Sequence, residues 1–138
     1  MRHKKSGRKL GRARPHRKAL LNNLARSLLI KGRIKTTEAK AKEVVRLADK
    51  LITLGKKGGL SSRREAARVI KDKKIIARLF EEIAPRFSTR KGGYTRVIKL
   101  LPRLGDGASL ALVELVEKPE EKKKPLEKKK KEKKAQTK

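Results

Sequence analysis

Cysteine is absent from this chain, and its absence removes several kinds of chemistry at once. Without thiolates there are no disulfides, no zinc knuckles and no cysteine nucleophile. Only His3 and His16 remain as imidazole ligands or bases, and the acid nearest to them in the sequence is Glu38. Because the sequence shows no paired carboxylates and no Ser/His/Asp set, we predict a protein that is not an enzyme and needs no metal or cofactor.

Aromatic residues and long apolar runs are also scarce. Tyr94, Phe80 and Phe87 are the only aromatic side chains, too few for the stacking platforms with which single-strand RNA modules hold several bases. No apolar stretch approaches the ~20 residues that a membrane-spanning helix needs, and no apolar segment follows the basic N-terminus as it would in a signal peptide. We therefore expect a soluble protein that is not exported.

Acidic residues are missing from the first 37 positions, which carry thirteen Lys and Arg. The whole chain of 138 residues has a formal net charge of +29. A compact surface with this charge repels itself unless a polyanion neutralises it, and each neutralised phosphate releases condensed counterions. The charge therefore predicts a nucleic-acid-binding protein, with RNA as the expected partner.

Charge and apolar content divide the chain into an arm (1–14), a globular domain (15–117) and a tail (118–138). The arm has two glycines and three apolar side chains, so it cannot bury enough surface to order alone and should fold on its partner. The tail consists of Lys, Glu and Pro with almost no apolar content, which predicts disorder. The 36% of hydrophobic residues allows one modest core, in the middle part.

Apolar residues at helical spacing predict four helices in the globular domain. Helix limits follow from proline, glycine and capping residues. The expected limits and caps are Pro15 and Gly32 for the first helix, Thr37 and Gly55 for the second, Ser62 with Glu65 as a capping box at the start of the third, and Asp72 and Pro85 for the fourth.

Two segments rich in branched side chains, 94–101 and 110–116, lie on either side of a glycine-containing turn, which predicts an antiparallel hairpin. A short extended segment, 33–36, follows the first helix. Because 110–116 is apolar on both faces, we place it inside the sheet, beside 34–36 and covered by helices. The prediction is an α+β fold: a helix, a short strand, three helices, then a β-hairpin that completes a small mixed sheet packed by helices.

Three basic segments are candidates for RNA contact, and each has a plainer explanation. The arm is either an RNA-penetrating extension or a solvated tail, and its lack of acids favours phosphate contact. Residues 35–42 place two threonines and free backbone N–H groups at a helix start, which suits a phosphate or a simple N-cap equally. In 86–96, Gly92 and Gly93 would let the backbone lie against ribose-phosphate while Tyr94 stacks or bonds. The plainer reading of 86–96 is a helix-to-strand turn, and Phe87 is expected in the core either way.

Four separated segments also form a specific pattern. They are Met1-Arg2-His3-Lys4 with Ser6-Gly7-Arg8, Ile34-Lys35-Thr36-Thr37-x-x-Lys40-Ala41-Lys42-Glu43, Leu51-Ile52-Thr53-Leu54, and Pro85-Arg86-Phe87 followed by Gly92-Gly93-Tyr94-Thr95-Arg96. Together, over residues 1–117, they resemble the bacterial large-subunit ribosomal protein seventeen family. The resemblance implies a structural component of the large ribosomal subunit that binds large-subunit rRNA near the exit tunnel and supports assembly, without enzyme activity.

The resemblance also implies neighbouring large-subunit ribosomal proteins as partners, a cytoplasmic location on the ribosome, no membrane and no small-molecule substrate. Charge alone leaves an alternative, a histone-like architectural protein that coats duplex DNA without reading its sequence. The residues predicted to bind RNA are Arg2, His3, Lys4, Lys5, Arg8, Lys9, Arg12, Arg14, His16, Arg17, Lys18, Lys35, Thr36, Thr37, Lys40, Arg86, Arg90, Lys91, Gly92, Gly93, Tyr94 and Arg96.

Overall fold

The computed structural model describes residues 7–117. The predictions for the tail and for Arg2, His3, Lys4 and Lys5 therefore lie outside the described residues. Within residues 7–117, the order of elements is a helix, a strand, a group of helices and two strands, which confirms the α+β class.

Helix α1 (Arg14–Lys31) begins within one residue of the expected place. Pro15 lies in its first turn, where the missing N–H removes no intrahelical hydrogen bond. The helix ends at Gly32, which has a left-handed backbone (φ 73°) and donates its N–H to the Leu28 carbonyl at 2.8 Å. This geometry favours glycine, so the predicted stop is confirmed.

Strand β1 (Arg33–Thr37) and helix α2 (Glu38–Lys57) follow as expected. The predicted end of α2 at Gly55 is wrong, because the helix continues to Lys57 and Gly58 takes the C-cap position. A Cβ at Gly55 would lie 2.8 Å from the Cβ of Ala84. The close approach of a second helix therefore explains why position 55 is a glycine. The apolar stripe of α2 is buried along its length, at Ala41, Val44, Ala48, Leu51 and Ile52.

Helix α3 (Gly59–Ala67) starts three residues before Ser62. The predicted capping box is therefore wrong, since Ser62 lies inside the helix. The carboxylate of Glu65 instead accepts from Lys50 on α2, with Nζ and Oε1 2.7 Å apart. Glu65 therefore takes part in a surface ion pair between two helices rather than in a cap.

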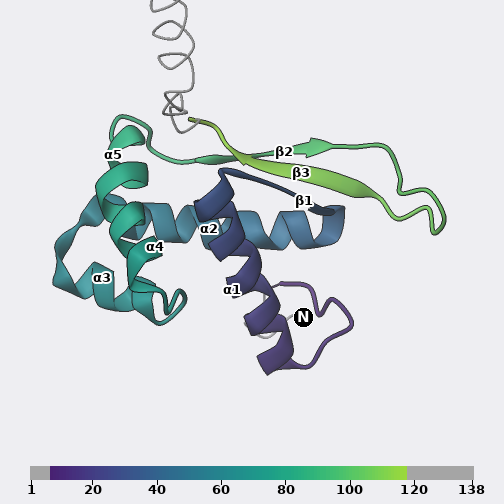
Figure 1. Ribbon diagram of the computed structural model, residues 1–138, viewed down its shortest axis with the longest axis horizontal. Helices are drawn as coiled ribbons and strands as arrows, with labels where there is room; N and C mark the ends of the chain where they lie inside the picture. Colours follow the sequence, from purple (N-terminus) through teal and green to yellow (C-terminus); the bar gives the residue numbers. More distant parts are fainter. Residues whose placement is uncertain (1–6, 118–138) are drawn as a thin grey trace, which may run out of the picture.

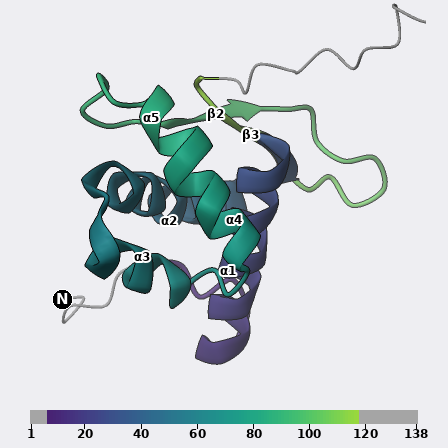
Figure 2. The ribbon, with the colours of Figure 1, turned by 60° about the vertical axis from the view of Figure 1, so that its left-hand side comes forward.

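The next helical rod consists of α4 (Lys73–Arg78), the π-helical turn η1 (Leu79–Ile83) and α5 (Ala84–Arg86). Asp72 caps its start as predicted, because Asp72 Oδ1 accepts from the Lys74 N–H at 3.0 Å. Pro85 does not stop the rod, which continues to Arg86 (Figure 2). In η1 the Ala84 N–H donates to the Leu79 carbonyl, five residues back, and this wider turn accommodates a proline that a regular α-helix would reject.

Strands β2 (Thr95–Lys99) and β3 (Leu110–Leu115) form the predicted hairpin, and β3 is the central strand in the order β1-β3-β2. Both pairings are antiparallel. We expected a mixed sheet, but the sheet contains no parallel pairing in residues 7–117. Strands β1 and β2 run in the same direction but are separated by β3.

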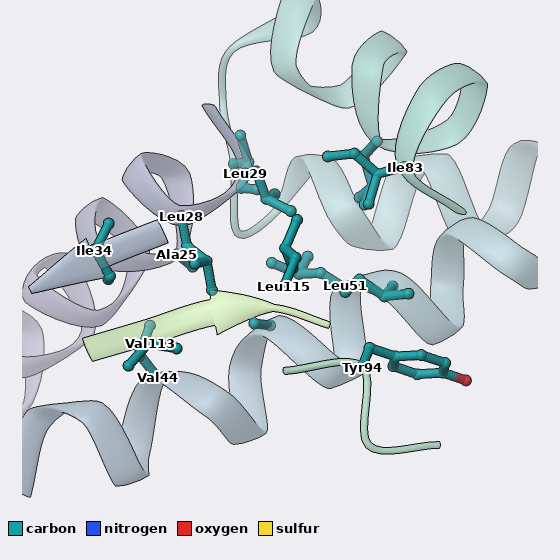
Figure 3. Close-up of a cluster of buried hydrophobic side chains, with 14 of the residues drawn as sticks. Ala25, Leu28, Leu29, Ile34, Val44, Leu51, Ile83, Tyr94, Val113 and Leu115 are labelled. Carbon is teal, nitrogen blue, oxygen red and sulfur yellow. The ribbon is translucent and has the colours of Figure 1, made fainter. Parts of the chain in front are cut away.

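Helices α1 and α2 pack against one face of the sheet (Figure 1). The register aligns Ile34, Val113 and Val97 in one row across the three strands, toward the helices. Figure 3 shows Val113 and Leu115 of β3 beside Val44 and Leu51 of α2 in this core. In the described part of the chain no helix covers the other face, so the expectation that helices cover β3 holds for one face only. An antiparallel sheet tolerates this because one face can meet solvent.

Candidate nucleic-acid interface

The structure distributes the described candidate residues over three places. The first turns of α1 lie at the bottom of the molecule and the loop after α5 lies at the top in both views (Figures 1 and 2), and Figure 1 shows the arm beside the start of α1. The junction of β1 and α2 lies near the base of the long β2–β3 loop (Figure 1). The three sequence segments therefore do not form one continuous site.

Residues 7–13 of the arm fold back toward α2 without forming a helix or strand. The Arg8 N–H donates to Oε1 of Glu43 at 3.2 Å, and Arg12 donates from its guanidinium to the Leu10 carbonyl at 2.7 Å. The Nε of Arg12 is buried and has no hydrogen-bond partner among the described residues. The residues Arg8, Lys9, Arg14, His16 and Lys18 are exposed, and Arg12 and Arg17 are half-buried.

A groove of about 460 Å³ runs between α1 and the segment 68–72. Its cations come from both sides, Lys18 and Arg26 from α1 and Arg68 and Lys71 from the facing segment. The one acid in the lining, Asp72, accepts from Arg26 at 3.2 Å. Sequence reasoning missed this groove, because only the fold brings residues 68–72 to α1.

The junction of β1 and α2 does not have the free helix start that we considered for a phosphate. Thr37 occupies the N-cap position of α2, but its hydroxyl makes no capping hydrogen bond. The Glu38 N–H already donates to the Ser109 carbonyl at 3.0 Å. The Glu38 carboxylate lies 2.6 Å from Lys42 Nζ, and this hydrogen bond lowers the pKa of Glu38. A carboxylate in the first turn repels a phosphate, so the helix start is a poor anion site.

The loop after α5 is held from beneath by Tyr94. The Tyr94 ring is 2% exposed and packs edge-on against Phe87 at 5.3 Å between centroids. Its buried ring cannot stack on a base, so the expected stacking is wrong. Its hydroxyl donates to the Lys91 carbonyl at 3.4 Å and so positions the loop, while a hydrogen bond from Tyr94 to RNA stays a prediction. Phe87 is fully buried, as predicted.

Lys56 of α2 fixes the same loop from a position next to Tyr94. Its ammonium donates to the Arg90 carbonyl at 2.5 Å and lies 5.4 Å from the centre of the Tyr94 ring. The anchored loop leaves Lys91, Gly92 and Gly93 exposed. Gly93 has φ 64°, which accounts for the glycine, whereas a Cβ there would meet no atom within 4 Å.

Arg96 lies on the outer face of the sheet and is already paired. Its Nε donates to Oε1 of Glu114 at 3.0 Å, and Glu114 is a buried carboxylate of the central strand. Arg86 at the end of α5 is half-buried and has no carboxylate within 4 Å among residues 7–117.

Neither a metal-ligand cluster nor a membrane-spanning helix occurs in the described residues. Within residues 7–117 no three His, Cys, Asp or Glu side chains gather as metal ligands. None of the helices in that range has the length and apolar character needed to cross a bilayer.

Comparison with known proteins gives one consistent result. The profile of ribosomal protein L17 matches residues 20–116. The large ribosomal subunit protein bL17 of Syntrophotalea carbinolica is 55% identical over 117 residues, which cover 85% of this chain and 76% of that protein. The bL17 of Trichlorobacter lovleyi is 56% identical, covering 85% and 94%, and that of Staphylococcus carnosus is 55% identical, covering 79% and 98%. The resemblance read from the four sequence segments is confirmed, and the chain belongs to the ribosomal protein L17 family.

Proposed function

We propose that this chain binds large-subunit rRNA through the arm, α1 and the groove beside it, on the side of the subunit where the exit tunnel opens. Membership of the family supplies the coarser part of this statement: the chain is a structural, non-enzymatic component of the large subunit of the bacterial ribosome. The alternative, a histone-like protein that coats duplex DNA, is tested below by competition with DNA.

The distribution of ion pairs carries the proposal. Arg14, Arg17 and Lys18 on α1 have no carboxylate within 4 Å among residues 7–117, and Arg26 has only Asp72. Unneutralised cations on one helix repel each other, and RNA phosphates remove that repulsion. Asn22 and Asn23 line the groove between these cations and can donate to ribose or phosphate oxygens.

The loop after α5 supplies a second, separate contact. Its exposed backbone at Gly92 and Gly93 permits close approach of a ribose-phosphate strand, and Lys91 supplies a cation beside it. Lys56 and Tyr94 hold the loop in place from the core side. RNA bound at both places would contact opposite ends of the molecule (Figure 1).

Binding of the full chain to a large-subunit rRNA fragment at several salt concentrations tests the proposal. With ~8 phosphate contacts, the log-log salt slope should be about −6 to −7. The double variant Arg17→Glu, Lys18→Glu should lose affinity and flatten the slope by about 2, whereas Lys57→Glu, at an exposed site outside the groove, should change both much less.

Two results would count against this function. One is displacement of the rRNA fragment by bulk duplex DNA at equal phosphate concentration, which the DNA-coating alternative predicts. The other is an Arg17→Glu, Lys18→Glu variant that binds with unchanged affinity and slope. Crosslinks from Lys18 in intact subunits should also reach rRNA near the tunnel exit, and crosslinks confined to distant rRNA would contradict the proposed location.

A further inference from the structure

The outer face of the sheet and the β2–β3 loop expose apolar side chains. Three of the five large hydrophobic residues that are exposed in residues 7–117 lie here. On the loop, Leu101 is 86% exposed and Leu104 is 98% exposed, and Ile98 on β2 is 39% exposed opposite Leu112. Isolated exposed leucines are ordinary, but a cluster on one protruding loop indicates an interaction surface.

Leu101 and Leu104 belong to one wall of an open groove of about 1330 Å³, which we name the hairpin groove. The opposite wall is the β1–α2 junction, from a strand on the other edge of the sheet. The hairpin groove is lined by Lys35, Thr36, Thr37, Lys40, Leu100, Leu101, Pro102, Arg103, Leu104, Gly105, Gly107 and Leu110.

The two walls differ in charge balance. Arg103 on the loop is neutralised by Asp106, with Nε and Oδ1 3.0 Å apart, and this pairing lowers the pKa of Asp106 to about 2. Lys35 and Lys40 on the opposite wall have no carboxylate within 4 Å among residues 7–117. The hairpin groove therefore has an apolar wall facing two ammonium groups that lack an acidic partner.

We propose that the hairpin groove docks a segment of a neighbouring large-subunit protein, in which apolar side chains lie next to Asp or Glu. Apolar side chains would cover Leu101, Leu104 and Leu110, and carboxylates would pair with Lys35 and Lys40. Burial of the leucines supplies the attraction, and the two ion pairs orient the segment.

The same features argue against other occupants. An RNA strand presents no aliphatic surface to the leucines, and the groove lining contains no aromatic ring on which a base could stack. A second copy of this chain would bring another formal charge of +29 against the same lysines.

This inference uses the family's membership of the large subunit and does not depend on the proposed rRNA interface. Its test is a photo-crosslinking amino acid (benzoyl-phenylalanine) placed at Leu104 of the full chain, in purified, high-salt-washed large subunits. The expected product is a protein adduct whose crosslinked peptide contains apolar residues beside Asp or Glu. The control is the same amino acid at Leu60 on α3, which is 64% exposed outside the groove and should not yield that peptide.

A charge-reversal variant then links the adduct to the lysines. Lys35→Glu with Lys40→Glu should reduce the Leu104 adduct by about tenfold, whereas Lys57→Glu should leave it unchanged. Affinity of the isolated double variant for the rRNA fragment should fall less than that of the Arg17→Glu, Lys18→Glu variant, which carries the same change of charge; this comparison separates the test from that of the proposed function.

Each other outcome overturns the inference. An adduct with rRNA, or a loss of rRNA-fragment affinity in the Lys35→Glu, Lys40→Glu variant as large as that of the Arg17→Glu, Lys18→Glu variant, would assign the hairpin groove to RNA. An adduct with a second copy of this chain, a crosslinked peptide without acidic residues, or no adduct at Leu104 would each remove the proposed partner.

Discussion

Replacing Gly55 with alanine tests the close helix contact that the sequence alone hid. The added Cβ in α2 would lie 2.8 Å from the Cβ of Ala84 in α5, whereas carbon atoms in contact prefer about 3.5–4.0 Å. Ala84 has no side-chain torsion that could move its Cβ aside. The backbones of α2 and α5 must therefore separate by about 1 Å.

The expected cost follows from two opposing terms. Overpacking a close-packed core costs about 1–3 kcal/mol, while Gly→Ala inside a helix gains about 1 kcal/mol. We expect Gly55→Ala to lower the free energy of unfolding by about 1 kcal/mol. Ala84→Gly removes the opposing methyl group, so a double-mutant cycle should give a favourable coupling of about 1–3 kcal/mol.

Urea unfolding of the two single variants, the double variant and the parent protein measures this coupling. Gly92→Ala is the matched control, because its added Cβ meets no atom within 4 Å and its φ is not left-handed. It should change the free energy of unfolding by less than about 0.5 kcal/mol. If Gly55→Ala and Ala84→Gly prove additive within about 0.5 kcal/mol, the close-approach explanation of Gly55 is wrong.

Three further substitutions test the core, a partly buried carboxyl group and a loop glycine. Leu28→Ala should lower the free energy of unfolding, measured in urea, by ~2–5 kcal/mol because Leu28 is fully buried. Leu24 is half-buried, so an equal loss of unfolding free energy in Leu24→Ala would contradict this explanation. Burial raises the pKa of Asp49 above its ordinary value of 3.8. The ionised carboxylate therefore destabilises the fold, and this loss develops as the pH rises from 3.8 through the folded pKa. Asp49→Asn should raise the melting temperature at pH 7 and leave it unchanged below pH 3.8. Gly93→Ala should cost about 1–2 kcal/mol in thermal unfolding through its left-handed backbone, and an unchanged melting temperature would show that the loop relaxes.

The parts of the fold predicted correctly from the sequence are those whose cause is local. Gly32 ends α1 through its own backbone conformation, and Asp72 caps α4 by bonding an N–H two residues away. Pro85 was misread although the rule is local, because η1 changes the hydrogen-bond spacing before the proline. Gly55 was misread because its cause, Ala84, lies in another helix.

The residues of the candidate site also divide into those that the sequence could predict and those that it could not. The acid-free arm and α1 could be recognised from composition, since unneutralised charge is a property of the residues themselves. Arg68 and Lys71 gave no signal, because only the packing of the helices brings them opposite Lys18. Stacking of Tyr94 on a base was wrongly expected, since a lone aromatic residue beside two glycines looks the same in sequence whether its ring is exposed or buried.

The ion pairs of residues 7–117 divide the surface into two kinds. On the sheet and its loop, Glu114 and Asp106 neutralise the arginines beside them, and Glu38 lies within 4 Å of both Lys42 and Lys99. On α1 the one acid within reach is Asp72, which pairs with Arg26. RNA needs the cations that remain unpaired, whereas a leucine-rich surface with few free charges suits protein.

Two surfaces that use different forces should respond independently to substitution. A variant that combines Arg17→Glu and Lys18→Glu with Leu104→Asp should lose both rRNA affinity and the protein contact. Each loss should equal that of the separate variants, because the two sites share no residue. Leu104→Asp alone should leave the salt slope for the rRNA fragment unchanged, since it removes no cation. A steeper or shallower slope in that variant would mean that the β2–β3 loop contacts RNA, and the division of the surface would then be wrong.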